Sequence, residues 1–223
     1  MKIVTIVQAR QTSKRFPNKV LKTINGHTVI EIILKRLMKS KFLKSIVVAI
    51  PKNKKNLKLF NYLKKKNYKV FRGSEKNVLD RYYNAAKANK ADIIIRVTGD
   101  CPLVDTNIVE KGLKVFLKKN YDFVSNTIER SYPDGLDISI FSFDLLKKNW
   151  KSNQKSLAKE HVTINMKKDK SVKKFNFKNN KDFSNYRWTL DHKKDYKKIK
   201  KIFDIFYPDI FFSWKKILAK GIR

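Results

Sequence analysis

The sequence predicts an α/β protein in which a mainly parallel sheet lies between helices. Short runs of β-branched residues recur along the chain, and such runs are typical of strands that are buried on both faces of a parallel sheet. Stretches with helical spacing of apolar residues separate these runs, which indicates βαβ units. The chain has 223 residues and 42% hydrophobic content, enough for one full core. Since it shows neither an internal repeat nor a linker, we expect a single domain over residues 1–223.

The first strand and the loop after it organise the rest of the chain. Ile3, Val4, Ile6 and Val7 form the first β-branched run, and a polar, basic loop follows at residues 9–19. The loop carries three kinds of group that bind phosphate, namely the guanidinium groups of Arg10 and Arg15, the ammonium groups of Lys14 and Lys19, and the hydroxyl groups of Thr12 and Ser13. Ligands of open α/β sheets bind outside the carboxyl ends of the strands. We therefore expect this loop to hold a polyphosphate.

The remaining elements alternate between the two periodicities. Helical spacing predicts helices at residues 29–38, 56–65, 78–88, 107–117, 143–150, 158–166 and 193–206, and residues 214–218 close the chain. Apolar or alternating runs predict strands at residues 45–50, 68–71, 91–97, 123–124, 136–141, 172–177 and 186–190. The region of about 125–185 reads as a small insertion.

The net charge of +34 is the most unusual property of the composition. A strongly basic chain suggests a nucleic-acid-binding protein, which is one functional hypothesis. However, the cations are mostly lysines spread along nearly every expected helix, whereas base readout favours arginine. We expect a solvated basic surface that adheres to polyanions at low salt and binds no specific nucleic acid.

The number and spacing of cysteine and histidine residues restrict the expected location of the protein and the kinds of metal site it can hold. Cys101 is the single cysteine, so no intramolecular disulfide can form and a reducing, cytoplasmic location is expected. No apolar run reaches the roughly 20 residues of a spanning helix, so we expect no membrane insertion. The three histidines are scattered and no CxxC or HExxH motif occurs, which argues against a zinc site.

Two aspartates follow expected strands and can serve as metal ligands. Asp100 ends the run at 91–97, and Asp191 follows the run at 186–190. Carboxylates opposite a basic phosphate loop suit Mg²⁺, which keeps several waters and takes further ligands from substrate phosphates. The alternative role is a helix N-cap. Asp105 or Thr106 can fill that role near Asp100, whereas for Asp191 the cap remains a competing interpretation.

Three further loops carry polar groups. In the segment at 72–81, Ser74 or Asn77 can cap the next helix, and Arg81 either contacts a ligand or forms a surface pair with Asp80. The segments at 125–126 and 132–137 gather amide and carboxylate groups that suit a polyhydroxylated ligand, and a simple turn at 133–135 is the alternative. Cys101 is expected to be a packing residue.

Six motifs in order resemble the sugar cytidylyltransferases, which include the CMP-Kdo and CMP-sialic acid synthetases, and resemble most the branch of spore-coat polysaccharide biosynthesis. They lie at residues 8–21, 72–74 with 78–82, 96–103, 132–137, 160–163 and 187–191. The resemblance implies a Rossmann-like nucleotidyltransferase fold with a mixed seven-stranded sheet. It also implies transfer of CMP from CTP to a sugar or sugar acid, release of pyrophosphate, and a role in surface glycan biosynthesis.

The resemblance further implies roles for single residues, Mg²⁺ as cofactor, and a homodimer formed through the inserted region. The catalytic residues would be Arg10, Lys19 and Asp100, and the metal ligands Asp100 and Asp191. Nucleotide binding would use Ala9, Arg10, Ser13, Arg15, Lys19, Arg81 and Thr98. Acceptor binding would use Asn126, Asp134, Asp137, Glu160, His161 and Arg187.

The sequence departs from the Kdo enzymes around Arg81, where they carry Ser-Gly-Thr-Asp-Arg and this chain has residues 77–81 instead. It also differs beside Asp100, at residues 101–103. The same fold acting on another nucleotide, or on a phosphate or phosphonate acceptor, is therefore a second hypothesis. If the acceptor is a hydroxyl, Asp134 and Asp137 are candidates to take its proton.

Overall fold

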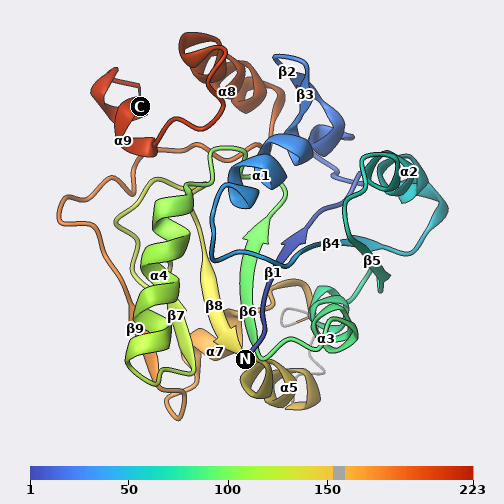
Figure 1. Cartoon of the computed structure of the whole chain (residues 1–223), viewed down its shortest axis with the longest axis vertical. Helices are drawn as coiled ribbons and strands as arrows, with labels where there is room; N and C mark the ends of the chain where they lie inside the picture. The colour runs from blue at the N-terminus through green and yellow to red at the C-terminus, as the bar shows by residue number, and fades with distance from the viewer. Residues whose placement is uncertain (153–158, 223) are drawn as a thin grey trace.

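The computed structural model describes residues 1–152 and 159–222, and within them a seven-stranded sheet forms the centre of the molecule (Figure 1). The strand order is β5-β4-β1-β6-β8-β7-β9. These strands are β1 (Ile3–Gln8), β4 (Ile46–Pro51), β5 (Val70–Gly73), β6 (Ile93–Thr98), β7 (Phe123–Ser125), β8 (Ser139–Ser142) and β9 (Lys174–Asn176). The expected fold class, a mixed sheet of seven strands between helices, is confirmed.

Parallel pairing joins the strands that carry the first half of the chain. β1 pairs in parallel with β4 and β6, and β4 does so with β5. β8 runs antiparallel to both β6 and β7, while β9 pairs in parallel with β7. The region of residues 125–185 therefore adds β8 and β9 to the main sheet. Because β1, β4 and β6 point the same way, the loops after them meet at one edge.

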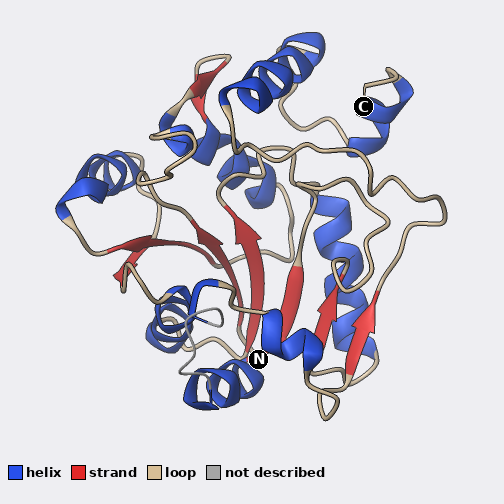
Figure 2. Ribbon diagram, turned by 180° about the vertical axis from the view of Figure 1, so that it is seen from behind, coloured by secondary structure: helices blue, strands red, loops and turns tan. Residues whose placement is uncertain are grey.

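Helices cover both faces of this sheet (Figure 2). One face packs its apolar side chains against α1 (Val29–Met38), α2 (Leu57–Lys65), α4 (Thr106–Lys118), α8 (Lys193–Phe206) and α9 (Trp214–Ala219). The other face packs against α3 (Val78–Ala88), α5 (Phe143–Ser152) and α7 (Ile164–Lys168). Alternate residues of one strand serve the two cores: Ile93 and Ile95 belong to the first and Ile94 to the second. Continuous β-branched runs thus reflect burial on both faces, as the sequence indicated.

A two-stranded hairpin of β2 (Thr23–Ile24) and β3 (His27–Thr28), which was not predicted from the sequence, lies apart from the main sheet (Figure 2). Asn25 and Gly26 form its turn with φ angles of 49° and 81°. The Asn-Gly pair is a recognised signal for such a turn, but the flanking strands are too short to show an alternating pattern.

The expected strand at residues 186–190 is wrong. Among the described residues, its only bridge joins Arg187 to Asp134, and the segment lies outside the sheet. The amide of Trp188 donates to the carbonyl of Asp134, and the amide of Leu190 donates to that of Asp100. The segment is extended because its amides bond to the loops at the carboxyl edge of the sheet. It has the apolar content of a strand, but it pairs with no strand of the sheet.

Most other bounds lie within two residues of expectation, and α1, α3 and α8 match it at both ends. The expected helix at 158–166 begins outside the described residues, and α7 occupies 164–168. Asp105 is the N-cap of α4 and Asn77 is the N-cap of α3, and both residues were among the predicted helix caps. No helix in residues 1–152 and 159–222 is long and apolar enough to cross a membrane.

A buried arginine ties the C-terminal segment to this scaffold. The guanidinium of Arg36 donates to the carbonyls of Val104 at 2.8 Å, Ile210 at 2.5 Å and Phe212 at 3.0 Å. It also stacks on the Phe212 ring, 5.1 Å from the centroid. Burial lowers the pKa of Arg36 to about 10. The segment before α9 is thereby held against the loop that follows Asp100.

Candidate active site

A cleft of about 830 Å³ opens at the carboxyl edge of β1 and β6. Its positively charged lining residues are Arg10, Lys14, Arg15, Lys19, Lys55, Arg81 and Arg96, and its negatively charged ones are Glu75, Asp100, Glu160 and Asp191. Ala9, Ser13, Thr98, Gly99 and His161 complete most of the remaining wall. The nucleotide-binding residues expected from the sequence therefore all line one cleft, which suits an anionic ligand.

Lys19 connects the basic loop to both candidate metal aspartates. Lys19 is only 7% exposed. Its ammonium donates to Asp100 Oδ2 at 2.8 Å, to Asp191 Oδ1 at 3.0 Å and to the carbonyl of Leu190 at 2.8 Å. One cation thus lies between two carboxylates that are 91 positions apart in the numbering of the chain. These three contacts join the loop after β1, the loop after β6 and the extended segment before α8.

Asp191 is the most heavily paired carboxylate of the site. Besides Lys19, it contacts Arg15 at 2.9 Å and Arg187 at 3.0 Å. Burial alone would raise the pKa of Asp191, but the hydrogen bond and charge of Lys19, with Arg187 and Arg15, outweigh it and lower that pKa to about 2. The competing interpretation of Asp191 as a helix cap is not supported, because His192 is the N-cap of α8 and forms a capping box with Asp195.

The turn after β6 is shaped by a close approach of two strand ends. The amide of Gly99 donates to the carbonyl of Gln8 at 2.7 Å, and a Cβ on Gly99 would lie 2.8 Å from that oxygen and 2.9 Å from the Ala9 Cβ. Only glycine allows this approach without a shift of the backbone. The glycine therefore brings Asp100 beside the basic loop.

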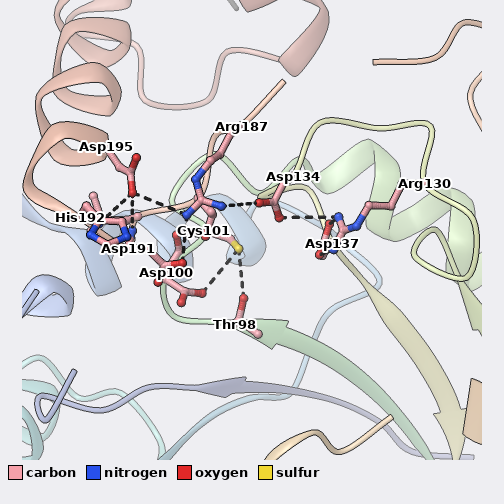
Figure 3. Close-up of polar contacts among 12 residues, drawn as sticks. Thr98, Asp100, Cys101, Arg130, Asp134, Asp137, Arg187, Asp191, His192 and Asp195 are labelled. Atoms are coloured by element: carbon pink, nitrogen blue, oxygen red, sulfur yellow. Dashed lines mark hydrogen bonds and ion pairs between the residues drawn. The ribbon is translucent and has the colours of Figure 1, made fainter. Parts of the chain in front are cut away.

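Cys101 follows Asp100, and its sulfur contacts the side chains of Thr98 and Asp100 (Figure 3). Its Sγ is 3.0 Å from Thr98 Oγ1, and the residue is 4% exposed. Burial, with the charge of Asp100, raises the pKa of the thiol well above its usual value. A protonated, covered thiol is a poor nucleophile, which supports the expected packing role.

The basic loop is held in shape by Gln11, which the sequence analysis did not select. Its side-chain oxygen accepts from the amide of Leu59 at 2.7 Å, and its side-chain nitrogen donates to Asn18 at 2.9 Å. Its own amide donates to the side chain of Asn56 at 2.8 Å. Asn18 has a positive φ of 59° just before Lys19. Hydrogen bonds between the amide groups of Gln11, Asn18 and Asn56, and not the cations of the loop, therefore fix the backbone that leads into Lys19.

Arg81 forms part of the other wall of the cleft. It is 2% exposed, and it donates to the carbonyl of Ser74. Burial lowers the pKa of Arg81 to about 10. The alternative of a surface pair with Asp80 is not observed, since Asp80 accepts instead from Asn84 and Trp150. Arg81 thus points inward, as the ligand-binding interpretation required.

The predicted acceptor residues divide into three groups. Asp134 and Asp137 form a row of alternating charge with two arginines beside Asp191 (Figure 3): Arg187 contacts Asp134 at 3.0 Å, and Arg130 contacts Asp137 through two bonds of 2.6 Å. Burial, followed by the charge of Asp137, raises the pKa of Asp134.

Glu160 and His161 form the second group and line the cleft, and Glu160 approaches Arg10 at 3.8 Å. Asn126 stands alone. It is 1% exposed, donates to the carbonyl of Leu136 and accepts from the amide of Ile138, both at 2.9 Å. Its amide supports the backbone that leads into β8, so the geometry gives it a structural role in place of the expected acceptor contact.

Several residues of this region were not anticipated as site residues: Lys55, Glu75 and Arg96 line the cleft, and Arg130 pairs with Asp137. Arg96 lies inside a recognised motif, so an arginine within an otherwise apolar strand was the available signal. Among the described residues, no group of three or more His, Cys, Asp or Glu could hold a metal ion. The two candidate metal ligands, Asp100 and Asp191, both contact the ammonium of Lys19.

Comparison with known proteins adds an independent finding. The family described as Cytidylyltransferase matches residues 4–218. An uncharacterized protein of Methanocaldococcus jannaschii is 38% identical over 216 residues, which covers 94% of this chain and 88% of that protein. The spore coat polysaccharide biosynthesis protein SpsF of Bacillus subtilis is 29% identical over 209 residues, with 90% and 86% coverage. The solved structure of a cytidylyltransferase from Leptospira borgpetersenii is 32% identical, with a TM-score of 0.94 and coverage of 99% of this chain and 93% of that one.

Proposed function

Because the chain belongs to the cytidylyltransferase family, we propose that it transfers CMP from CTP to a sugar or sugar acid and supplies surface glycan biosynthesis. The observation that carries this proposal is the position of Lys19 between Asp100 and Asp191 in a basic cleft. The cleft brings together the cations that a triphosphate needs and the carboxylates that a metal needs. The similarity to the spore-coat protein supports the biosynthetic role.

In the proposed reaction, an acceptor oxygen attacks the α-phosphorus of CTP. The new phosphorus–oxygen bond forms as the bond to the bridging oxygen breaks, and pyrophosphate leaves with that electron pair. Negative charge therefore grows on the bridging and leaving oxygens. Arg10, Arg15 and Lys19 line the cleft where the triphosphate would lie, and fixed charges placed in advance are usually the largest contribution to such catalysis.

Asp100 and Asp191 would hold Mg²⁺, whose preference for oxygen ligands they meet. When bound, the ion would neutralise phosphate charge. Its ligands already share the ammonium of Lys19, so the pair of carboxylates is suited to a cation. Lys19 would then exchange one or both of its carboxylate contacts for a phosphate oxygen.

If the acceptor is a hydroxyl, its proton requires a base. We favour Asp134 over Asp137, because two bonds of 2.6 Å from Arg130 occupy both oxygens of Asp137. The raised pKa of Asp134, caused by burial and by Asp137, makes it a better proton acceptor than an ordinary aspartate. A phosphate or phosphonate acceptor would need no base.

The test is a thermal-shift comparison of CTP, UTP, GTP and ATP, each with Mg²⁺, followed by pyrophosphate detection with a panel of acceptors. We expect CTP to raise the melting temperature most and pyrophosphate to appear only when a cognate acceptor is present. No stabilisation by any of the four triphosphates would contradict the proposal. Stabilisation by another base would favour the second hypothesis, the same fold with a different nucleotide.

The proposal includes a homodimer, which light scattering of the purified protein tests. The high positive charge is expected to cause only salt-sensitive adhesion to nucleic acid. Binding of duplex or single-stranded DNA that persists at about 200 mM salt and is insensitive to Asp100→Ala would instead support the nucleic-acid hypothesis.

A further inference from the structure

A second groove, separate from the cleft, combines apolar and cationic side chains. It has a volume of about 500 Å³ and shares no lining residue with the cleft. It lies between helix α4 and strand β9, and its lining residues are Asn107, Glu110, Lys111, Lys114, Val115, Lys118, Lys119 and Phe175. A ligand held in this groove would therefore leave the nucleotide cleft open.

One wall of the groove is an open edge of the main sheet. β9 is the last strand in the order, and no strand of the described structure pairs with its outer side (Figure 1, Figure 2). The carbonyl of Lys173 and the amide of Phe177 bond toward β7. Because backbone groups alternate in direction along a strand, the amide and carbonyl groups of Lys174 and Asn176 point outward. An open row of this kind is a template for a further strand.

The floor of the groove is apolar. Phe175 of β9 stacks on Tyr121 with ring centroids 5.2 Å apart, and Val115 faces the groove from α4. The neighbouring Lys174 lies on the opposite face of the strand, where its ammonium donates to a carbonyl of α7 at 2.7 Å. A segment that pairs with β9 would therefore place every second side chain over Phe175 and α4.

The rim of the groove is positively charged. Glu110, the only described carboxylate that lines it, accepts a hydrogen bond from Ser40 at 2.6 Å. Lysine is abundant on every helix, so the charge alone marks no site, but here it borders an apolar floor and an open strand edge. Four lysines line the groove, and in the described part of the chain none of them forms an ion pair: Lys111, Lys114, Lys118 and Lys119.

These three features distinguish between possible occupants. A second copy of this chain would bring its own net charge of +34 to a positively charged rim, and like charges across an interface are unfavourable. A bilayer presents a flat surface, whereas the apolar residues here line a hollow between a helix and a strand. Nucleic acid has the required charge but no backbone that continues a sheet. An acidic polypeptide meets all three requirements.

We propose that the groove between α4 and β9 binds an extended acidic segment of a partner protein, which adds a strand to the outer edge of β9. The backbone of the segment bonds to Lys174 and Asn176, and its apolar side chains cover Phe175. Its carboxylates pair with the lysines of α4. Strand addition to a free sheet edge is an established mode of peptide recognition, in which main-chain bonds give affinity and alternate side chains give specificity.

Fluorescence anisotropy with a labelled synthetic peptide tests this inference. In the probe, glutamate and valine alternate on one face of the extended peptide, and serine occupies the other face. Binding is measured at about 200 mM salt, where nonspecific attraction is weak. The test variant is Lys114→Glu with Lys118→Glu. The matched control is Lys197→Glu with Lys201→Glu, which has the same spacing and charge change on exposed lysines of α8.

We expect the α4 double variant to bind the peptide at least about 10-fold more weakly than the wild type, and the α8 control to change affinity less than about 2-fold. Both variants alter only exposed side chains, so their melting temperatures should stay close to that of the wild type. A peptide that is methylated on every backbone nitrogen keeps its charge and side chains but loses its donors, and it should bind at least about 10-fold more weakly.

Four results would overturn the inference. Equal affinity of the two double variants would show that the groove does not select the peptide, and full binding of the methylated peptide would exclude strand addition. Single-stranded DNA that displaces the peptide, and loses its own binding only in the α4 variant, would assign the groove to nucleic acid. Light scattering that shows a changed oligomeric state only in the α4 variant would assign it to a second copy of the chain.

Discussion

The contacts of Lys19 predict a large loss of both stability and activity when its charge is removed. In Lys19→Met the side chain keeps its length but loses the three bonds to Asp100, Asp191 and Leu190. Removal of one partner from a buried ion pair costs about 3–5 kcal/mol. The expected loss is smaller, about 2–3 kcal/mol, because Asp191 keeps Arg15 and Arg187 and the side chain of Asp100 is 29% exposed.

Calorimetry and turnover measure this prediction. In a chain of this size, a loss of about 2–3 kcal/mol lowers the melting temperature by about 4–12 °C. The rate of pyrophosphate release should fall by about 10²–10³, as when other preorganised charges are removed. Lys22→Met, which alters an exposed lysine close to the same loop, should leave both quantities nearly unchanged.

Divalent ions give the experiment a second readout. Without Lys19, Asp100 and Asp191 have no cation between them, so Mg²⁺ added without nucleotide should stabilise Lys19→Met more than the wild type. The reasoning is refuted if Lys19→Met melts within about 1 °C of Lys22→Met and responds to Mg²⁺ as the wild type does.

Three further predictions concern the turn after β6 and its neighbours. Gly99→Ala should destabilise the protein by about 1–3 kcal/mol in urea unfolding, because the new Cβ would lie 2.8 Å from a backbone oxygen. In the control, Gly112→Ala, the new Cβ would meet only the ends of side chains, and stability should change by less than about 1 kcal/mol. Cys101 should resist alkylation at pH 8 until the protein unfolds, and Cys101→Ala should keep most activity; rapid labelling of the native protein would contradict burial of the thiol. Asp191, whose pKa falls from 3.8 to about 2 on folding, adds stability that is present above pH 3.8 and is lost as the pH falls through about 2. Stability curves of the wild type and Asp191→Asn should therefore converge in acid, and a gap that stays constant with pH would refute this.

Elements whose signal is local were predicted well. The helices α1 and α3 match their expected bounds, because apolar spacing and the capping residue lie inside the same short window. The extended segment at 186–190 was misassigned for the opposite reason. Its hydrogen bonds reach Asp134 and Asp100, which are 54 and 90 positions from Trp188 and Leu190 in the numbering. A pattern of apolar residues shows that a segment is buried, but not which backbone it bonds.

The candidate site shows the same division. The motifs selected Arg10, Lys19 and Asp100, which all line the cleft. They gave no means to see that Gln11 fixes the loop or that Lys19 bridges both aspartates. Those facts depend on contacts between separate segments of the chain. Because lysine and arginine occur throughout the sequence, residue type does not distinguish the cations of the site from those of the surface.

The burial of a cation, unlike its residue type, distinguishes the cations of the site from those of the surface. With 53 lysines and arginines in the sequence, one more cation near a loop carries little information, and most of these side chains are free to remain in water. Lys19 and Arg81 are nevertheless 7% and 2% exposed. Burying a charge is unfavourable unless the charge gains a partner. The burial of Lys19 and Arg81 is therefore informative in a way that the many exposed cations are not. Lys19, a buried cation that contacts two carboxylates, holds the site together. Arg81, which in the described structure contacts a backbone carbonyl and no carboxylate, is a position at which we expect a ligand's charge.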